Sequence, residues 1–168
     1  MTSTYLNQTR KTQTKEQRKN KIGLTKYSLR VILLIKPEVI KAFNMEQFFN
    51  YSNSGFEVRD EIVNAHRESW KTISNSGSFW SGEERVEIAK QARSARLQRR
   101  ELPFNRSYPS CSLSNEVLEA TYTIAADAHK INKVWADSQI AELGSGAYIE
   151  IASIVATVSA IDAFSEAL

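Results

Sequence analysis

The chain has 168 residues, of which 42% are hydrophobic and 24% charged, and its formal net charge at pH 7 is +3. This composition is typical of one soluble globular domain with some additional chain. A single cysteine, Cys111, excludes an intrachain disulfide and any all-cysteine metal site, and it fits a reducing, cytoplasmic location.

Positive charge is concentrated in residues 1–44, which carry ten Lys or Arg and two acidic residues. Residues 45–168 are mildly acidic, so the total charge does not indicate a nucleic-acid partner, and we expect none. Residues 1–22 have few apolar side chains, which predicts that the extension is mostly disordered. Three interpretations of 1–44 stay open: an over-extended gene prediction with Met45 as the true start, a basic arm for nucleic acid or anionic lipid, or a targeting peptide.

The first helix of the body is predicted within residues 56–73. The stripe Ile62, His66, Trp70 and Ile73 has spacings of four, four and three, as one face of a helix requires. The turn-forming residues 75–78, Asn-Ser-Gly-Ser, are expected to end it.

Residues 79–100 predict the second helix. Ser81 and Glu84 form a Ser-x-x-Glu capping box, in which each side chain accepts a hydrogen bond from the other residue's backbone N–H. A narrow face of apolar and small residues permits close helix packing and consists of Val86, Ile88, Ala89 and Ala92. A loop containing two prolines is expected at 99–112.

Ser114 is expected to cap the third helix, with Leu113 and Leu118 as a hydrophobic staple. Its buried side is predicted from the apolar spacing as Val117, Leu118, Tyr122, Ala125 and Ala128. The helical spacing of apolar residues is interrupted at 127–130. A fourth helix is predicted after this break and carries Ile131, Val134, Trp135 and Ile140. A turn is predicted at 143–146.

The last segment, 147–168, is apolar nearly all round, and no residue between Ile151 and Ile161 is charged. More than twenty residues without Gly or Pro are too many for one strand, so we predict a helix in the middle of the domain or in a subunit interface. The chain stops while this pattern continues, which favours a fragment truncated at its C-terminus, a fraying helix or one that meets a partner chain. The longest unbroken apolar run, 31–35, is too short to span a bilayer, and we expect no membrane span.

Segments 79–93, 131–135 and 147–168, together with Asn-Ala-His-Arg-Glu-Ser-Trp at 64–70, resemble the peroxidase-related branch of the carboxymuconolactone decarboxylase-like, or alkyl hydroperoxidase D-like, superfamily. The resemblance covers 57–168. It implies a compact all-α domain of five to six helices, here 45–168, assembled as a homo-oligomer (a trimer or hexamer) and acting on a small-molecule substrate.

The thiol peroxidase activity of that group uses a Cys-x-x-Cys pair, a His four residues beyond it and a Glu about twelve residues before it. Glu84 matches the family Glu, but the cysteine positions then fall near Arg96 and Arg99 and the histidine near Pro103. We therefore expect a member without the redox pair and without thiol peroxidase activity of its own. Decarboxylase members also lack this pair, so its absence does not exclude an enzyme.

Four residues are candidates for catalysis, and each has a structural alternative. Glu84 is a proton relay or a capping residue; His66 is a general base or a hydrogen-bonded core or interface histidine. Glu150 is stabilised by the helix dipole, or is buried beside an Arg with a raised pKa and a catalytic role. Cys111 is a one-cysteine peroxidatic thiol or an unreactive loop thiol. No cofactor or metal site is expected.

The basic cluster is interpreted as a solvated helix end rather than a phosphate grip, and it comprises Arg93, Arg96, Arg99, Arg100 and Arg106. Two further functions remain open. One is a non-redox enzyme that uses Glu84 or Glu150 with His66 as acid and base on a small carbonyl compound. The other is a structural or interaction domain with a basic arm. Convergence of these three side chains would favour the enzyme, and separate structural roles the interaction domain.

Overall fold

The computed structural model describes residues 49, 51, 52, 54–100, 107, 108 and 110–168. These residues form five α-helices and a 3₁₀ turn, and they contain no strand, so the prediction of an all-α domain is confirmed. The extension 1–44 and the loop residues 101–106 lie outside the described residues. The elements are α3 (Asp60–Ser74), α4 (Gly82–Arg99), α5 (Asn115–Ala126), η2 (Ala128–Lys130), α6 (Lys133–Leu143) and α7 (Ser145–Ala167).

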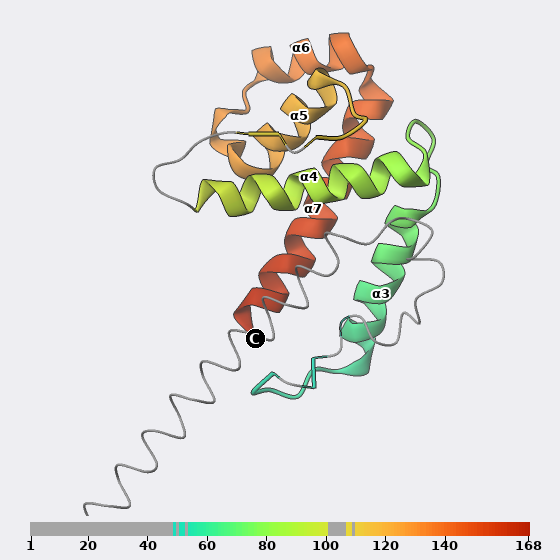
Figure 1. The fold of residues 1–168 in the computed structure, drawn as a ribbon, viewed down its shortest axis with the longest axis vertical. Coiled ribbons are helices and arrows are strands. Elements are labelled where there is room, and N and C mark those ends of the chain that lie inside the picture. Colours follow the sequence, from blue (N-terminus) through green and yellow to red (C-terminus); the bar gives the residue numbers. More distant parts are fainter. Residues whose placement is uncertain (1–48, 50, 53, 101–106, 109) are drawn as a thin grey trace, which may run out of the picture.

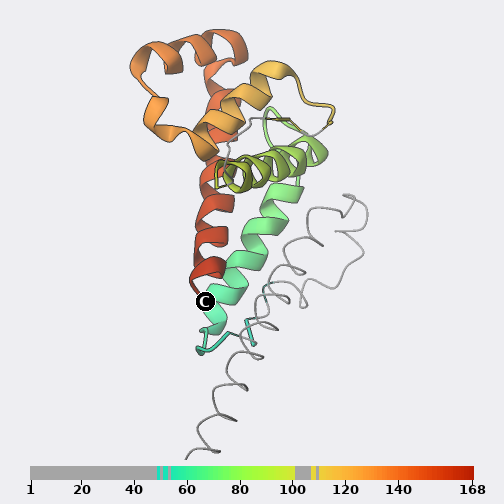
Figure 2. The ribbon, with the colours of Figure 1, turned by 60° about the vertical axis from the view of Figure 1, so that its left-hand side comes forward.

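Helices α4 and α7 cross near the middle of the domain and contact each other (Figure 1). Helix α5 packs against both, and α6 lies over α5 and α7 at one end. Helix α3 runs beside the C-terminal half of α7 at the other end, as the rotated view also shows (Figure 2). Each of the five helices therefore contacts α4 or α7.

The core lies where α3, α4, α5 and α7 meet. Ile88 and Ala92 of α4, Ala120 of α5, and Ile151 and Val158 of α7 are completely buried. The small residues predicted on α4 are all buried, which confirms that this helix packs closely against its neighbours.

The corner between α3 and α4 has the turn and the capping box that the sequence predicts. Helix α3 ends at Ser74, and Ser81 and Glu84 form both hydrogen bonds of the capping box. Gly82 begins α4 directly against the backbone carbonyl of Ser74, where a β-carbon would overlap the oxygen. The turn at the end of α3 and the start of α4 are therefore in contact.

Four predicted details are wrong. Ile131, expected on the fourth helix, lies before α6, which begins at Lys133. Ala128 is exposed, because the chain leaves α5 at Asp127 and enters η2. The turn expected at 143–146 is one residue long: Gly144, at φ 84°, joins α6 to α7, and helix resumes at Ser145. Ser114 occupies the N-cap position of α5 but makes no side-chain capping bond.

Helix α7 is confirmed as a long helix, but it is buried on one side and not all round. Its buried face comprises Ala147, Ile151, Ile154, Val155, Val158, Ile161 and Asp162. Among the described residues, α7 is the one helix long and apolar enough to cross a membrane, and 39% of its most apolar 18-residue stretch is buried inside the domain. Core helices of soluble proteins meet the same criterion, so it does not decide between a bilayer and a protein partner.

Candidate functional site

Glu84 has the structural role of a cap. Its carboxylate accepts hydrogen bonds from the backbone N–H of Ser81 at 2.8 Å and from the Ser81 hydroxyl at 2.8 Å. The Ser81 hydroxyl accepts in turn from the Glu84 N–H at 3.3 Å. Because this carboxylate is engaged at the start of its own helix, Glu84 is not directed toward the other candidate residues.

Glu150 is paired with an arginine, as expected for a carboxylate at this partly buried position. It forms a salt bridge with Arg85 of α4, and both side chains are largely buried. It also accepts a hydrogen bond from the backbone N–H of Phe79 at 3.1 Å. Arg85 donates as well to the carbonyl of Ile73 at the end of α3. The pair thus joins the start of α4 and the second turn of α7 to the α3–α4 corner.

His66 lies in an aromatic cluster at the opposite end of α7. Its Nδ1 is 2.7 Å from the hydroxyl of Tyr51, which is 3.1 Å from the hydroxyl of Ser165. The rings of Phe49 and Phe164 meet its imidazole edge to face, at centroid distances of 5.8 and 5.1 Å. Burial lowers the pKa of His66, and it raises the pKa of the Tyr51 hydroxyl.

Neither Cys111 nor the second histidine of the chain, His129, joins this cluster. Cys111 is a free, half-buried thiol that packs against the apolar core. His129, in η2, is exposed. Among the described residues, no group of three or more His, Cys, Asp and Glu side chains could hold a metal ion.

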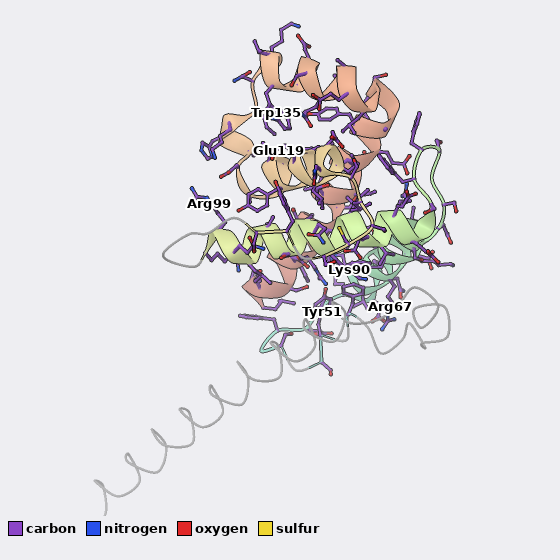
Figure 3. The ribbon with its side chains drawn as sticks, turned by 45° about the horizontal axis from the view of Figure 1, so that its top comes forward. Tyr51, Arg67, Lys90, Arg99, Glu119 and Trp135 are labelled. Carbon is purple, nitrogen blue, oxygen red and sulfur yellow. The ribbon has the colours of Figure 1, made fainter. Side chains whose placement is uncertain are left out.

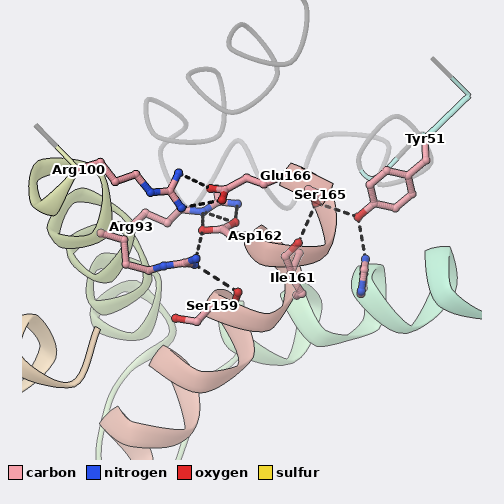
Figure 4. A network of polar contacts seen from close by, with 10 residues as sticks. Tyr51, Arg93, Arg100, Ser159, Ile161, Asp162, Ser165 and Glu166 are labelled. Carbon is pink, nitrogen blue, oxygen red and sulfur yellow. Dashed lines mark hydrogen bonds and ion pairs between the residues drawn. The ribbon is translucent and has the colours of Figure 1, made fainter. Parts of the chain in front are cut away.

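Arg93 and Arg96 of α4 are engaged with α7, which corrects the prediction of a solvated helix end for these two residues. Both nitrogens of the buried Arg93 side chain that face Asp162 donate to its carboxylate, with two of the contacts at 2.9 Å (Figure 4). Arg96 donates to the carbonyl of Ser159 at 3.2 Å and lies 3.6 Å from the same carboxylate. Arg93 also stacks over an aromatic ring, with its guanidinium carbon 5.1 Å from the centre of Trp70.

The end of α4 continues this pattern with more exposed pairs. Arg100 contacts Glu166 with two hydrogen bonds of 3.0 and 2.6 Å, which lowers the pKa of that carboxyl group. Asp127 is buried after the last turn of α5, where Lys130 and Arg99 approach it at 2.7 and 3.3 Å. The hydrogen bond from Lys130 lowers the pKa of Asp127. Each described arginine of the cluster therefore forms an ion pair within the domain. Arg106 lies outside the described residues.

The candidate residues do not converge. Glu150 and Phe164, which contacts His66, are 14 residues apart on α7, or about 21 Å along the helix axis. A surface pocket of about 630 Å³ lies elsewhere, at the start of α6, and its lining comprises Asn132, Lys133, Val134, Trp135 and Ser138. Trp135 lies at this pocket and Tyr51 lies beside His66, at opposite ends of the domain (Figure 3).

Sequence reasoning missed four polar residues that organise these contacts: Tyr51, Arg85, Asp162 and Ser165. One signal was present for Asp162. Arg93, Arg96 and Arg100 lie three and four residues apart on one helix face, and Asp162 and Glu166 lie four apart on another, so the two rows could match. No comparable pattern marks Tyr51, because it lies before α3 in irregular chain.

Comparison of the chain with protein-family models, with curated proteins and with solved structures finds no match.

Proposed function

We propose that this chain is a helical domain of the alkyl hydroperoxidase D-like type that has no thiol peroxidase activity and acts as a self-associating interaction domain. The family assignment is supported by the sequence segments that resemble the group and agrees with the all-α fold. The observation that supports self-association is the uncharged, exposed face of α7, and it consists of Ile149, Ser153, Ala156, Ala160 and Ala163, followed by Ala167.

Separate structural roles favour an interaction domain over the acid–base enzyme. Glu84 caps a helix, Glu150 is bound by an arginine, and His66 contacts Phe164, which lies about 21 Å along α7 from Glu150. A general acid and base must both reach one substrate within hydrogen-bonding distance. These three side chains do not meet that requirement.

A second copy of this chain fits the exposed face of α7 best. The spacings along that face, four, three, four, three and four, read the same in both directions. In an antiparallel pair, the large Ile149 would therefore lie opposite Ala167, and Ala156 opposite Ala160. The small residues allow the two helices to approach closely, and a twofold axis makes the contact reciprocal.

A bilayer fits this helix less well than a partner helix does. Helix α7 carries Glu150, Asp162 and Glu166, and each of them is ion-paired with α4. Transfer of such pairs into hydrocarbon costs free energy that a contact between uncharged faces avoids. The proposed twofold contact occurs in a dimer or a hexamer, but not in an isolated trimer.

Substitution of Ala160 by Glu is expected to abolish self-association, because two carboxylates would meet near the twofold axis. Sedimentation velocity over a range of concentrations measures this, with circular dichroism as a check on helix content. Ala65→Glu is the matched control, since Ala65 is exposed on α3 and is not part of the α7 face. A wild-type chain that stays monomeric, or an Ala160→Glu variant that still assembles, would contradict the proposal.

No peroxidase turnover is expected with t-butyl hydroperoxide and dithiothreitol, because the chain lacks the Cys-x-x-Cys pair and Cys111 is half-buried against the apolar core. The comparison is between the wild-type chain and Cys111→Ser at equal concentration. Turnover that is lost in the variant would identify a one-cysteine peroxidase and refute the inactive assignment, without bearing on the α7 contact.

A further inference from the structure

The segment between α3 and α4 holds a phenylalanine ring against the first turns of α7 (Figure 1). Phe79 donates its backbone N–H to the carboxylate of Glu150 at 3.1 Å. The next residue, Trp80, donates its indole N–H to the carbonyl of Ala147 at 3.2 Å. Gly77 donates its backbone N–H to the carbonyl of Trp80 at 2.8 Å and so closes a turn around Phe79. The chain is therefore attached to α7 at Phe79 and at the residue that follows it.

Gly146 provides the surface on which the tip of the Phe79 ring lies. A β-carbon at position 146 would be 2.1 Å from Cζ of the ring, far closer than two carbon atoms approach each other. The ring therefore occupies the space that a side chain at position 146 would fill. Although its tip contacts α7, 59% of the Phe79 surface is exposed. An aromatic ring is thus held in a fixed place with most of its surface free for a contact.

This ring extends the exposed face of α7 by one helical turn. Gly146, beneath the ring, precedes Ile149 by three residues, and residues three apart are neighbours on a helix surface. Ile149 is 61% exposed and begins the row of uncharged residues that continues to Ala167. Phe79 and Ile149 therefore form a large apolar end to a face that otherwise consists of serine and alanine.

The sizes of the side chains along this face suit two crossing helices. Two helices that cross are closest at the crossing point and diverge toward their ends. In the antiparallel pair the crossing point lies between Ala156 and Ala160, where small side chains let the helices approach. Phe79 and Ile149 lie toward one end, where the space between the helices is wider, and they would face the small side chain of Ala167 in the second copy.

We propose that Phe79 is the anchor of the self-association surface, and that the ring of each copy binds the C-terminal end of α7 in the other. This inference rests on the proposed twofold contact between α7 helices. Buried aromatic anchors supply much of the binding energy of protein interfaces, and an anchor that is already held in place loses little conformational freedom on binding. The twofold axis places two such contacts in every dimer.

Phe79→Ala is expected to raise the dissociation constant of the dimer about 30-fold or more, as truncation of an anchor residue does. Sedimentation velocity of the full chain measures it, with circular dichroism as a check on the fold. Leu97→Ala is the control, because this apolar side chain of α4 is also about half exposed, at 48%, and is not part of the α7 face. A wild-type dimer whose dissociation constant is unchanged in Phe79→Ala would refute the anchor alone, whereas a monomeric wild-type chain would refute the α7 contact as well.

Gly146→Ala tests the position of the ring without changing the aromatic residue. The new β-carbon would displace the ring from α7, so the dimer should dissociate more readily. The fold should be kept, because alanine favours a helix more than glycine does and the displaced atoms are the tip of an exposed side chain. In a Phe79→Ala background, Gly146→Ala should have no further effect. An equal loss in both backgrounds, or no loss in either, would contradict the proposal.

Crosslinking tests which end of the second copy the ring meets. Ser78, next to Phe79, and Ala167 are both exposed, so each can carry a reactive thiol. Ser78→Cys and Ala167→Cys chains, each in a Cys111→Ser background, are mixed in equal amounts with a short bismaleimide, which couples two thiols. Covalent dimers that join position 78 to position 167 are expected in the mixture. Covalent dimers that form only between identical variants would show a parallel contact and overturn the proposal.

Discussion

Replacement of Asp162 by Ala is expected to lower the free energy of unfolding by about 3–5 kcal/mol, the loss typical when one partner of a buried ion pair is removed. Arg93 has 5% of its surface exposed, so its guanidinium would stay buried without the carboxylate that accepts its hydrogen bonds. Urea denaturation followed by circular dichroism measures the change at constant pH.

Glu166→Ala is the matched control for that substitution. Glu166 also pairs with an arginine of α4 from the same helix, but its side chain and that of Arg100 are 36% and 51% exposed. An exposed pair contributes about 0.2–1 kcal/mol, so the control should lose much less stability. Equal losses in the two variants would show that burial is not what makes the Asp162 contact important.

A double substitution separates the contribution of the ion pair itself from the cost of leaving one buried charge without its partner. Arg93→Met combined with Asp162→Leu removes both charges and keeps apolar volume at the site. Such replacements are commonly neutral or stabilising, so most of the loss seen in Asp162→Ala should be recovered. If the double variant were as unstable as the single one, packing of the arginine over Trp70 would be the larger contribution.

Ile88→Ala is expected to cost about 2–5 kcal/mol, because it leaves a cavity where α4 meets the other core helices. Ile88 is completely buried. Thermal and urea unfolding of the variant measure the loss directly.

Val134→Ala is the control for this cavity, because it also shortens an aliphatic side chain but at a site that is 80% exposed. A change within about 0.5 kcal/mol is expected there. A small loss in Ile88→Ala would mean that the core can collapse around residue 88, contrary to the close packing described for α4.

Local chemistry was predictable from the sequence. The capping box at Ser81 was confirmed because its two hydrogen bonds connect residues three apart, and such bonds depend on little else. The length of α7 was confirmed for a similar reason, since a long stretch without Gly or Pro has few alternatives to a helix.

Contacts between distant segments were not predictable in the same way. Arg93 and Asp162 are 69 residues apart, and the arginine was interpreted as solvated because basic residues at a helix end usually complement the helix dipole in solvent. The face of α7 that stays exposed was also hidden, since an apolar pattern all round does not say which neighbours a helix has. The family resemblance and the proposed self-association stay predictions.

The close contact of Gly82 with the backbone carbonyl of Ser74 restricts which residues can replace glycine at position 82 during evolution. Residue 82 lies in a surface corner, where sequence drift is usually tolerated. Here any side chain would push the backbone of one helix away from the start of the next. Codon 82 should therefore retain glycine under purifying selection, while exposed positions close by, such as Ser76 and Ser78, are free to vary.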